Sequence, residues 1–188
     1  LCNSLSSMLL LIIVNRISGE SRGGFFALAY STAQLLFSVG GFEIRPVQST
    51  DIKNKFTFNQ YFTSRMLNCI IMLICMIGYI VVNGYTGVEA LTVFWILGYR
   101  MVEAVADVYS GLFQQRERID ISGKEMLMRS GISTITFTII LWLTDNLLYA
   151  AMTLTLTSLV IMLFYDLHMK KYFEPTPVHL EWKGILGI

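Results

Sequence analysis

Residues 61–113 read YFTSRMLNCIIMLICMIGYIVV, then NGYTG, then VEALTVFWILGYRMVEAVADVYSGLF. Each long run is close to the ~20 residues that an α-helix needs to cross a bilayer. The NGYTG turn between them is too short to do more than reverse the chain. This stretch therefore predicts two antiparallel membrane-spanning helices, over residues 61–82 and 90–113.

Further apolar runs predict spans at residues 25–44, 126–143 and 147–167. Short turns at residues 83–87 and 144–146 alternate with longer polar loops, which are expected at residues 46–60, 114–125 and 168–183. A further loop is expected at residues 18–24, on the side of the short turns. The alternation predicts an all-α, polytopic membrane helix bundle.

Both ends of the chain look cut. The first apolar run starts at Leu1 and stops at Asn15-Arg16, about five residues short of a span. Another apolar run begins at Gly184 and reaches the last residue. We expect residues 1–182 to form a six-helix membrane lobe with a truncated first helix. Residues 183–188 are then the start of the next transmembrane helix.

The composition agrees with a membrane protein. Of the 188 residues, 54% are hydrophobic and 14% are charged, whereas soluble domains carry about 25% charged residues. The net charge of +1 comes without a basic cluster, which argues against a nucleic-acid partner. Cys69 and Cys75 lie six residues apart, which fits neither a disulfide nor a structural zinc site. No metal is expected.

Lysine and arginine predict the orientation, because they concentrate on the cytoplasmic side of membrane proteins. Two cations, Arg16 and Arg22, flank the loop expected at residues 18–24. Eleven flank the three long loops: Arg45, Lys53, Lys55, Arg65, Arg116, Arg118, Lys124, Arg129, Lys170, Lys171 and Lys183. We therefore expect the long loops and the cut N-terminus in the cytoplasm.

Polar residues inside three spans recur at helical spacing. In residues 90–113 and just beyond they are Arg100, Glu103, Asp107, Ser110 and Gln114, which fall within an arc of about 80° on a helix. The second span carries Ser31, Gln34, Ser38, Gly41 and Arg45, and the third carries Arg65, Asn68, Met72, Cys75 and Tyr79. Ionisable groups at membrane depth face a bundle interior or water, so the stripes predict a hydrated cavity between the three helices.

A second interpretation stays open. Arg100 and Glu103 are i,i+3 neighbours, and Glu103 and Asp107 are i,i+4 neighbours, so they could form an ion cluster that neutralises itself and joins helices. Two carboxylates against one cation, and the continuation of the stripe into Ser110 and Gln114, favour the cavity.

Patterns that would indicate an enzyme are absent from the sequence. There is no His-Glu-x-x-His, Gly-x-Ser-x-Gly, Walker A or Rossmann glycine motif, and no paired aspartates to hold Mg²⁺ on a phosphate. We expect neither catalysis nor a cofactor.

The order of landmarks resembles the polysaccharide (O-antigen) flippase family of the multidrug/oligosaccharidyl-lipid/polysaccharide (MOP) exporter superfamily. The resemblance rests on Gly19-Glu20, Gly24-Phe25, Gln34 and the run GFEIRPVQSTD at residues 41–51. It continues with Arg100-x-x-Glu103-x-x-x-Asp107-x-x-x-Gly111-x-x-Gln114 and with Arg118-x-Asp120-x-x-Gly123, Arg129, Tyr61 and Arg65. It extends over essentially the whole chain.

The resemblance implies the N-terminal six-helix lobe of a two-lobed, MATE-like bundle around a central cavity. Such proteins move a lipid-linked oligosaccharide, typically on undecaprenyl diphosphate, across the inner (cytoplasmic) membrane during surface polysaccharide and lipopolysaccharide synthesis. Expected partners are this substrate, membrane lipid and the polysaccharide polymerase with other export components.

The residues expected to meet the substrate lie on the polar stripes. We expect Arg100 and Arg65 to contact the diphosphate or sugar, and Gln34, Asn68 and Gln114 to contact sugar hydroxyls. Glu103 and Asp107 either tune Arg100 or carry a proton.

Two alternatives remain. A drug or cation antiporter of the same superfamily would use Glu103 and Asp107 as its cation site. The other is a non-transporting membrane subunit or scaffold of a polysaccharide-synthesis complex.

Overall fold

The computed structural model describes residues 2–40, 44–51 and 55–181, and all of its regular structure is helical within these ranges. The elements are α1 (Cys2–Gly40), α2 (Ile44–Thr50), α3 (Phe58–Val82), α4 (Gly87–Gln115), α5 (Ile119–Thr144), α6 (Leu147–Ile161), the π-helical segment η1 (Met162–Asp166) and α7 (Leu167–Phe173). The predicted all-α class is confirmed. The expected helix after residue 183, and the stripe position Gly41, lie outside the described residues.

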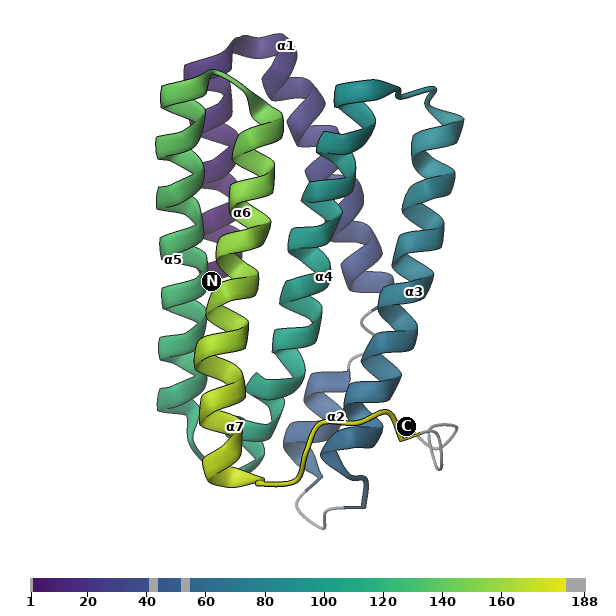
Figure 1. Ribbon diagram of the computed structural model, residues 1–188, viewed down its shortest axis with the longest axis vertical. Helices are drawn as coiled ribbons and strands as arrows, with labels where there is room; N and C mark the ends of the chain where they lie inside the picture. Colours follow the sequence, from purple (N-terminus) through teal and green to yellow (C-terminus); the bar gives the residue numbers. More distant parts are fainter. Residues whose placement is uncertain (1, 41–43, 52–54, 182–188) are drawn as a thin grey trace.

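Helix α1 is two helices joined at a sharp bend. Gly19 has φ 84° and ψ 172°, a conformation that glycine adopts readily and other residues rarely do. The chain reverses direction at this residue. The first half ascends and the second half descends beside it (Figure 1). The loop predicted at residues 18–24 was wrong in extent, because its polar residues remain helical on both sides of Gly19.

The short turns lie where the sequence predicted them. The α3–α4 connection and the α5–α6 connection are at the same end as Gly19 in Figure 1, and we call this the hairpin end. Asp145 adopts the left-handed conformation with φ 43°, and Asn146 caps α6 by accepting a hydrogen bond from the Leu148 N–H at 3.0 Å. These features end α5 and start α6 within two residues.

The opposite end, which we call the α2 end, is more helical than the sequence suggested. The three predicted long loops, at residues 46–60, 114–125 and 168–183, were wrong in extent. Helix α2 occupies the start of the first, three residues join α4 to α5 in the second, and α7 occupies the start of the third. The helices continue beyond the apolar runs that mark their membrane-spanning parts. Helix ends predicted from the loss of apolar residues were therefore placed too early. Thr57 starts α3 with a capping box that also uses Gln60.

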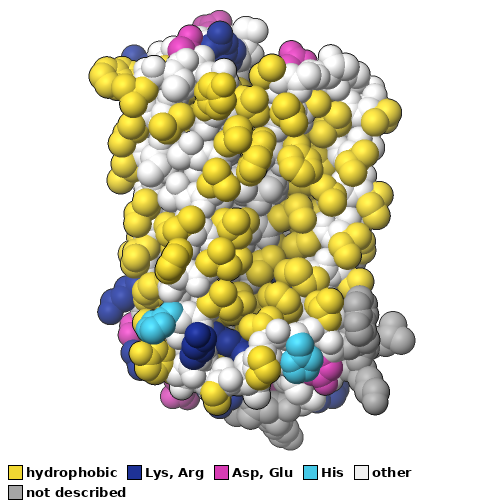
Figure 2. Space-filling model, in the orientation of Figure 1, with side chains coloured by type: hydrophobic (Ala, Val, Ile, Leu, Met, Phe, Trp, Pro, Cys, Tyr) yellow, Lys and Arg dark blue, Asp and Glu magenta, His cyan; other side chains and the backbone are white. Residues whose placement is uncertain are grey.

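Helix α4 runs through the middle of the bundle, with α5 and α6 on one side, α3 on the other and α1 behind it (Figure 1). Sixteen of its 29 residues are buried. Its neighbours have the opposite arrangement, with isoleucines of α3 such as Ile70, Ile74 and Ile77 exposed. Figure 2 shows hydrophobic side chains spread over the face in view, with charged side chains gathered toward its two ends.

Within the described part of the chain, three helices are long and apolar enough to cross a membrane: Phe58–Val82, Ile119–Thr144 and Leu147–Phe173, the last formed by α6, η1 and α7 together. Helix α4 is not among them, although the sequence predicted a span at residues 90–113. The reason is that α4 carries Glu89, Arg100, Glu103 and Asp107. The charged face of α4 contacts other helices instead of lipid. The composition of α4 therefore differs from that of a lipid-exposed span.

The lysine and arginine distribution predicts that the α2 end is cytoplasmic, and two single cysteines can test this. In a full-length protein without Cys2, Cys69 and Cys75, Gly123→Cys should react from the cytoplasmic side and Thr86→Cys from the other side. Both positions are exposed, and a Cβ at Gly123 meets no atom within 4 Å. The measurement is labelling of intact cells with a membrane-impermeant maleimide. Reaction of both cysteines from outside would overturn this orientation.

Candidate functional site

The polar stripe of α4 lies inside the bundle as predicted. Arg100, Glu103 and Ser110 are buried, and Asp107 and Gln114 are half-buried. Their spacing of three and four residues keeps them on one face of the helix, and that face contacts α1, α2, α3 and α5. The candidate site is built around this face of α4.

Arg100 is paired with its immediate neighbours, although its buried Nε has no hydrogen-bond partner among the described residues. Its Nη1 forms an ion pair with Glu103 Oε2, and the Tyr99 hydroxyl donates to Glu103 Oε1 at 3.0 Å. The guanidinium carbon lies 4.4 Å from the centroid of the Tyr30 ring of α1, a cation–π distance. The Arg100 side chain is 2% exposed. An external ligand cannot reach it in this conformation.

Asp107 binds two arginines from two other helices. Arg45 Nη1 of α2 lies 2.8 Å from Asp107 Oδ1, and Arg65 Nη2 of α3 lies 3.1 Å from Asp107 Oδ2. Arg45 also donates from Nε to Gln114 Oε1 at 3.3 Å. The second interpretation, in which Arg100 neutralises both Glu103 and Asp107, is therefore wrong about Asp107. Arg45 of α2 and Arg65 of α3 bind its two carboxylate oxygens.

Two carboxylates that were not predicted as part of the site, Glu125 and Asp166, form a third group of charges with Arg129. Arg129 on α5 forms ion pairs with Glu125 and, at 3.4 Å, with Asp166. Ser110 donates a hydrogen bond to the second oxygen of Glu125. Both carboxylate side chains are fully buried, and Asp166 ends the π-helical segment η1, a kind of helix irregularity that is frequent at functional sites.

Two signals in the sequence could have identified this group. Glu125 and Arg129 are i,i+4 neighbours, and Asp166 is the one charged residue in the span predicted at residues 147–167. Glu125 was assigned to a loop instead, because the helix was started at the first long apolar run.

The three groups meet around one small cavity of about 20 Å³, lined by Phe37, Arg45, Glu103, Asp107, Ser110, Met126 and Arg129. A cavity of this volume holds about one water molecule. The four arginines and the four carboxylates balance formally, and the space predicted as a hydrated cavity is largely filled by side chains that pair with one another. We call these eight residues, Arg45, Arg65, Arg100, Glu103, Asp107, Glu125, Arg129 and Asp166, the ionic network.

The stripes of the second and third spans only partly face this network. Ser31 and Ser38 of α1 and Cys75 of α3 are exposed. The buried face of this part of α1 is apolar instead, with Phe26, Ala29, Tyr30 and Ala33. Ser38 satisfies its hydroxyl by donating to the Gln34 carbonyl at 3.0 Å, so a serine can face outward at little cost.

Two predicted sugar contacts lie beside the network. Asn68 is buried one turn beyond Arg65, and its Nδ2 has no hydrogen-bond partner among the described residues. Gln34 is half-buried on α1, one turn after Tyr30, and within the described residues its side chain has no hydrogen bond. Both amides are therefore available to a polar ligand that reaches their level.

Asp51 holds α2, and with it Arg45, against α3 and α4. Its carboxylate accepts from the backbone N–H groups of Lys55 at 2.9 Å and Phe56 at 3.0 Å, and from the Tyr61 hydroxyl at 3.1 Å. Its carbonyl accepts from Gln115 Nε2. Partial desolvation raises the pKa of Asp51, but these hydrogen bonds outweigh it and leave the pKa below its usual value.

Comparisons of the chain with protein-family models, with curated protein sequences and with solved structures gave no match.

The pairing of Arg100 predicts a specific pattern of stability. Glu103→Gln should leave Arg100 buried without a charged partner and lower the free energy of unfolding by about 3–5 kcal/mol. Adding Arg100→Met should recover most of that loss. Adding Asp107→Asn instead should destabilise the protein further, because Asp107 serves Arg45 and Arg65. The measurement is thermal unfolding of the full-length protein in detergent.

The matched control is Asp120→Asn, which breaks the exposed ion pair between Arg118 and Asp120 and should change stability little. Recovery by Asp107→Asn but not by Arg100→Met would contradict the pairing in the structure.

Proposed function

We propose that the chain is the N-terminal lobe of a membrane transporter that flips a lipid-linked oligosaccharide of the undecaprenyl-diphosphate type. The observation that carries the proposal is the convergence of arginines from four helices inside an apolar bundle: Arg45, Arg65, Arg100 and Arg129. Arginine is the side chain best suited to a diphosphate, because its planar fork binds phosphate oxygens in pairs. The motifs that resemble the O-antigen flippases support the same assignment.

Arg45 is the arginine that a headgroup would meet first. Its side chain is 30% exposed, against 3% for Arg65 and 2% for Arg100. It lies at the α2 end, which the charge distribution predicts to be cytoplasmic. Arg65 and Arg100 become available only when the helices separate, as alternating access requires.

Flipping needs no covalent step, but the anion must exchange partners with the protein. A diphosphate that binds Arg45 and Arg65 takes both cations from Asp107. The carboxylate would then stand unpaired in apolar surroundings, which is unfavourable unless it takes up a proton. Asp107 therefore links headgroup binding to charge compensation, and a bound proton crossing 100 mV would contribute about 2.3 kcal/mol.

The same contacts bear on the alternative of a drug or cation antiporter. Such a protein needs carboxylates that are open to the cation. Glu103 and Asp107, which the sequence offered for this role, bind Arg100 and the Arg45–Arg65 pair. In this conformation neither carboxylate is open to a cation. The proposed setting is the inner membrane, together with the polymerase and other export components of polysaccharide synthesis.

The proposal predicts that Arg45 controls transport more than stability. Full-length protein in vesicles should speed the transbilayer movement of a fluorescent undecaprenyl-diphosphate oligosaccharide. Arg45→Gln should slow this movement about tenfold, the effect of losing one charge-assisted hydrogen bond. Arg45→Lys should keep part of the rate. The Arg65–Asp107 ion pair survives both changes, so folding should persist.

Arg118→Gln is the matched control, because Arg118 is an exposed arginine at the same end whose partner is the exposed Asp120. It should leave the rate unchanged. Uptake of ethidium driven by a pH gradient, without movement of the lipid-linked oligosaccharide, would favour the antiporter. Neither activity in protein that folds correctly would favour the non-transporting subunit.

A further inference from the structure

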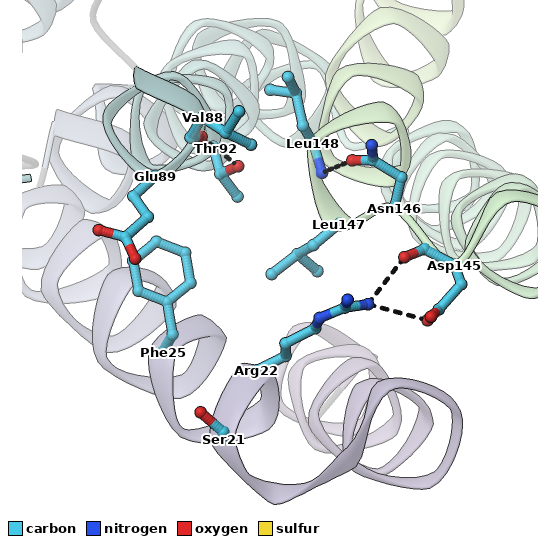
Figure 3. A pocket seen from close by; sticks show the side chains of 10 residues that line it. All are labelled: Ser21, Arg22, Phe25, Val88, Glu89, Thr92, Asp145, Asn146, Leu147 and Leu148. Atoms are coloured by element: carbon cyan, nitrogen blue, oxygen red, sulfur yellow. Dashed lines mark hydrogen bonds and ion pairs between the residues drawn. The ribbon is translucent and has the colours of Figure 1, made fainter. Parts of the chain in front are cut away.

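A second polar cavity, of about 310 Å³, lies at the hairpin end. Figure 3 shows the residues that line it. Its polar lining comes from Ser21 and Arg22 of α1, Glu89 and Thr92 of α4, and Asp145 and Asn146 of the α5–α6 turn. Phe25, Leu147 and Leu148 supply apolar surface. We call this cavity the hairpin pocket.

Arg22 lines one side of the hairpin pocket, where its side chain is 52% exposed. Its Nη1 donates to the Asp145 carbonyl at 2.8 Å and forms an ion pair with Asp145 Oδ1 at 3.1 Å. Ser18 also donates to that carboxylate oxygen, at 3.2 Å. A guanidinium carries five N–H donors, so the ion pair orients Arg22 and still leaves donors for a ligand.

Hydrogen-bonding groups of both kinds line this space. Figure 3 places Glu89 on the side opposite Arg22 and Asp145. Asn146 uses its amide oxygen to cap α6, which leaves its amide NH₂ as a donor. A ligand in the pocket would thus meet donors from Arg22 and Asn146 and an acceptor from Glu89.

The electrostatics favour a ligand without net charge. Glu89 and Asp145 exceed Arg22 by one negative charge. Two helices, α4 with 29 residues and α6 with 15, begin at the rim, and each helix N-terminus adds about half a positive charge. These contributions cancel. A phosphate or a strong cation would gain little here, whereas a polar neutral molecule meets no repulsion.

We propose that the hairpin pocket binds a neutral sugar. Sugars combine many hydroxyls, which need both donors and acceptors, with an apolar C–H face that packs on rings such as Phe25. A volume of about 310 Å³ is at the lower end of small-molecule sites, which suits one or two pyranose rings. In so far as this sugar belongs to the transported headgroup, the inference rests on the proposed function and places sugar recognition at the end opposite the arginines.

The test is binding of the methyl glycosides of glucose, galactose and N-acetylglucosamine to the full-length protein in detergent, by saturation-transfer NMR. Glucuronate is the charged comparison. At least one neutral glycoside should bind, and more tightly than glucuronate. Glu89→Gln and Phe25→Leu should each weaken its binding, Glu89→Gln about tenfold through the lost hydrogen bond to a charged group. Asp145→Asn should also weaken it, and asparagine tolerates the left-handed backbone at this position.

Tyr172→Leu is the matched control, because Tyr172 is an aromatic residue at the α2 end with 71% exposure and should not affect binding. Absence of binding by all three neutral glycosides, or equal binding by the pocket variants, would overturn the inference. Flipping assays separate it from the proposed function. Sugar binding that depends on Glu89, without any flipping, supports the pocket and refutes the flippase. Flipping without sugar binding supports the flippase and refutes the pocket.

Discussion

Asp107 and its two arginines are the interaction on which the arrangement of the helices depends. An ionised side chain inside an apolar bundle costs several kcal/mol unless it is paired. Asp107 on α4 can be paired only if α2 brings Arg45 and α3 brings Arg65 to within about 3 Å of it, as the structure has them. One carboxylate therefore sets the relative positions of three helices at the α2 end. Asp51 holds α2 in place to make this possible.

The same constraint explains the inverted distribution of polarity. The charged helix α4 lies in the centre, and the apolar helices α3, α5 and α6 turn their isoleucines, leucines and valines outward. In a lipid environment, apolar surfaces gain little by meeting one another, so polar pairs and small residues provide much of the specificity between helices. Gly111 is one such small residue. It lets α2 approach α4 closely, because a Cβ at this position would lie 2.3 Å from the Gln48 side chain of α2.

The sequence predicted the helices and hairpins better than the site. Apolar runs and short turns located α3, α4 and the start of α6 to within a few residues, because lipid imposes a length and a composition on each span. Spacing also identified the buried face of α4. It could not identify partners, because Arg45 approaches Asp107 from a separate short helix, and Glu125 was counted as loop. Partners across a bundle depend on how helices turn about their axes, which a single sequence does not specify.

The two polar regions differ in a way that suits an amphiphilic headgroup. The ionic network concentrates arginines, each held by a carboxylate, at the end predicted to face the cytoplasm. The hairpin pocket offers balanced donors and acceptors at the other end. Under the proposed function, ion pairs would bind the diphosphate of the substrate at one end of the bundle, and hydrogen bonds would bind its sugars at the other end. The anion would exchange ion-pair partners at the entrance, whereas the neutral sugars would exchange only hydrogen bonds at the exit, where weak binding favours release.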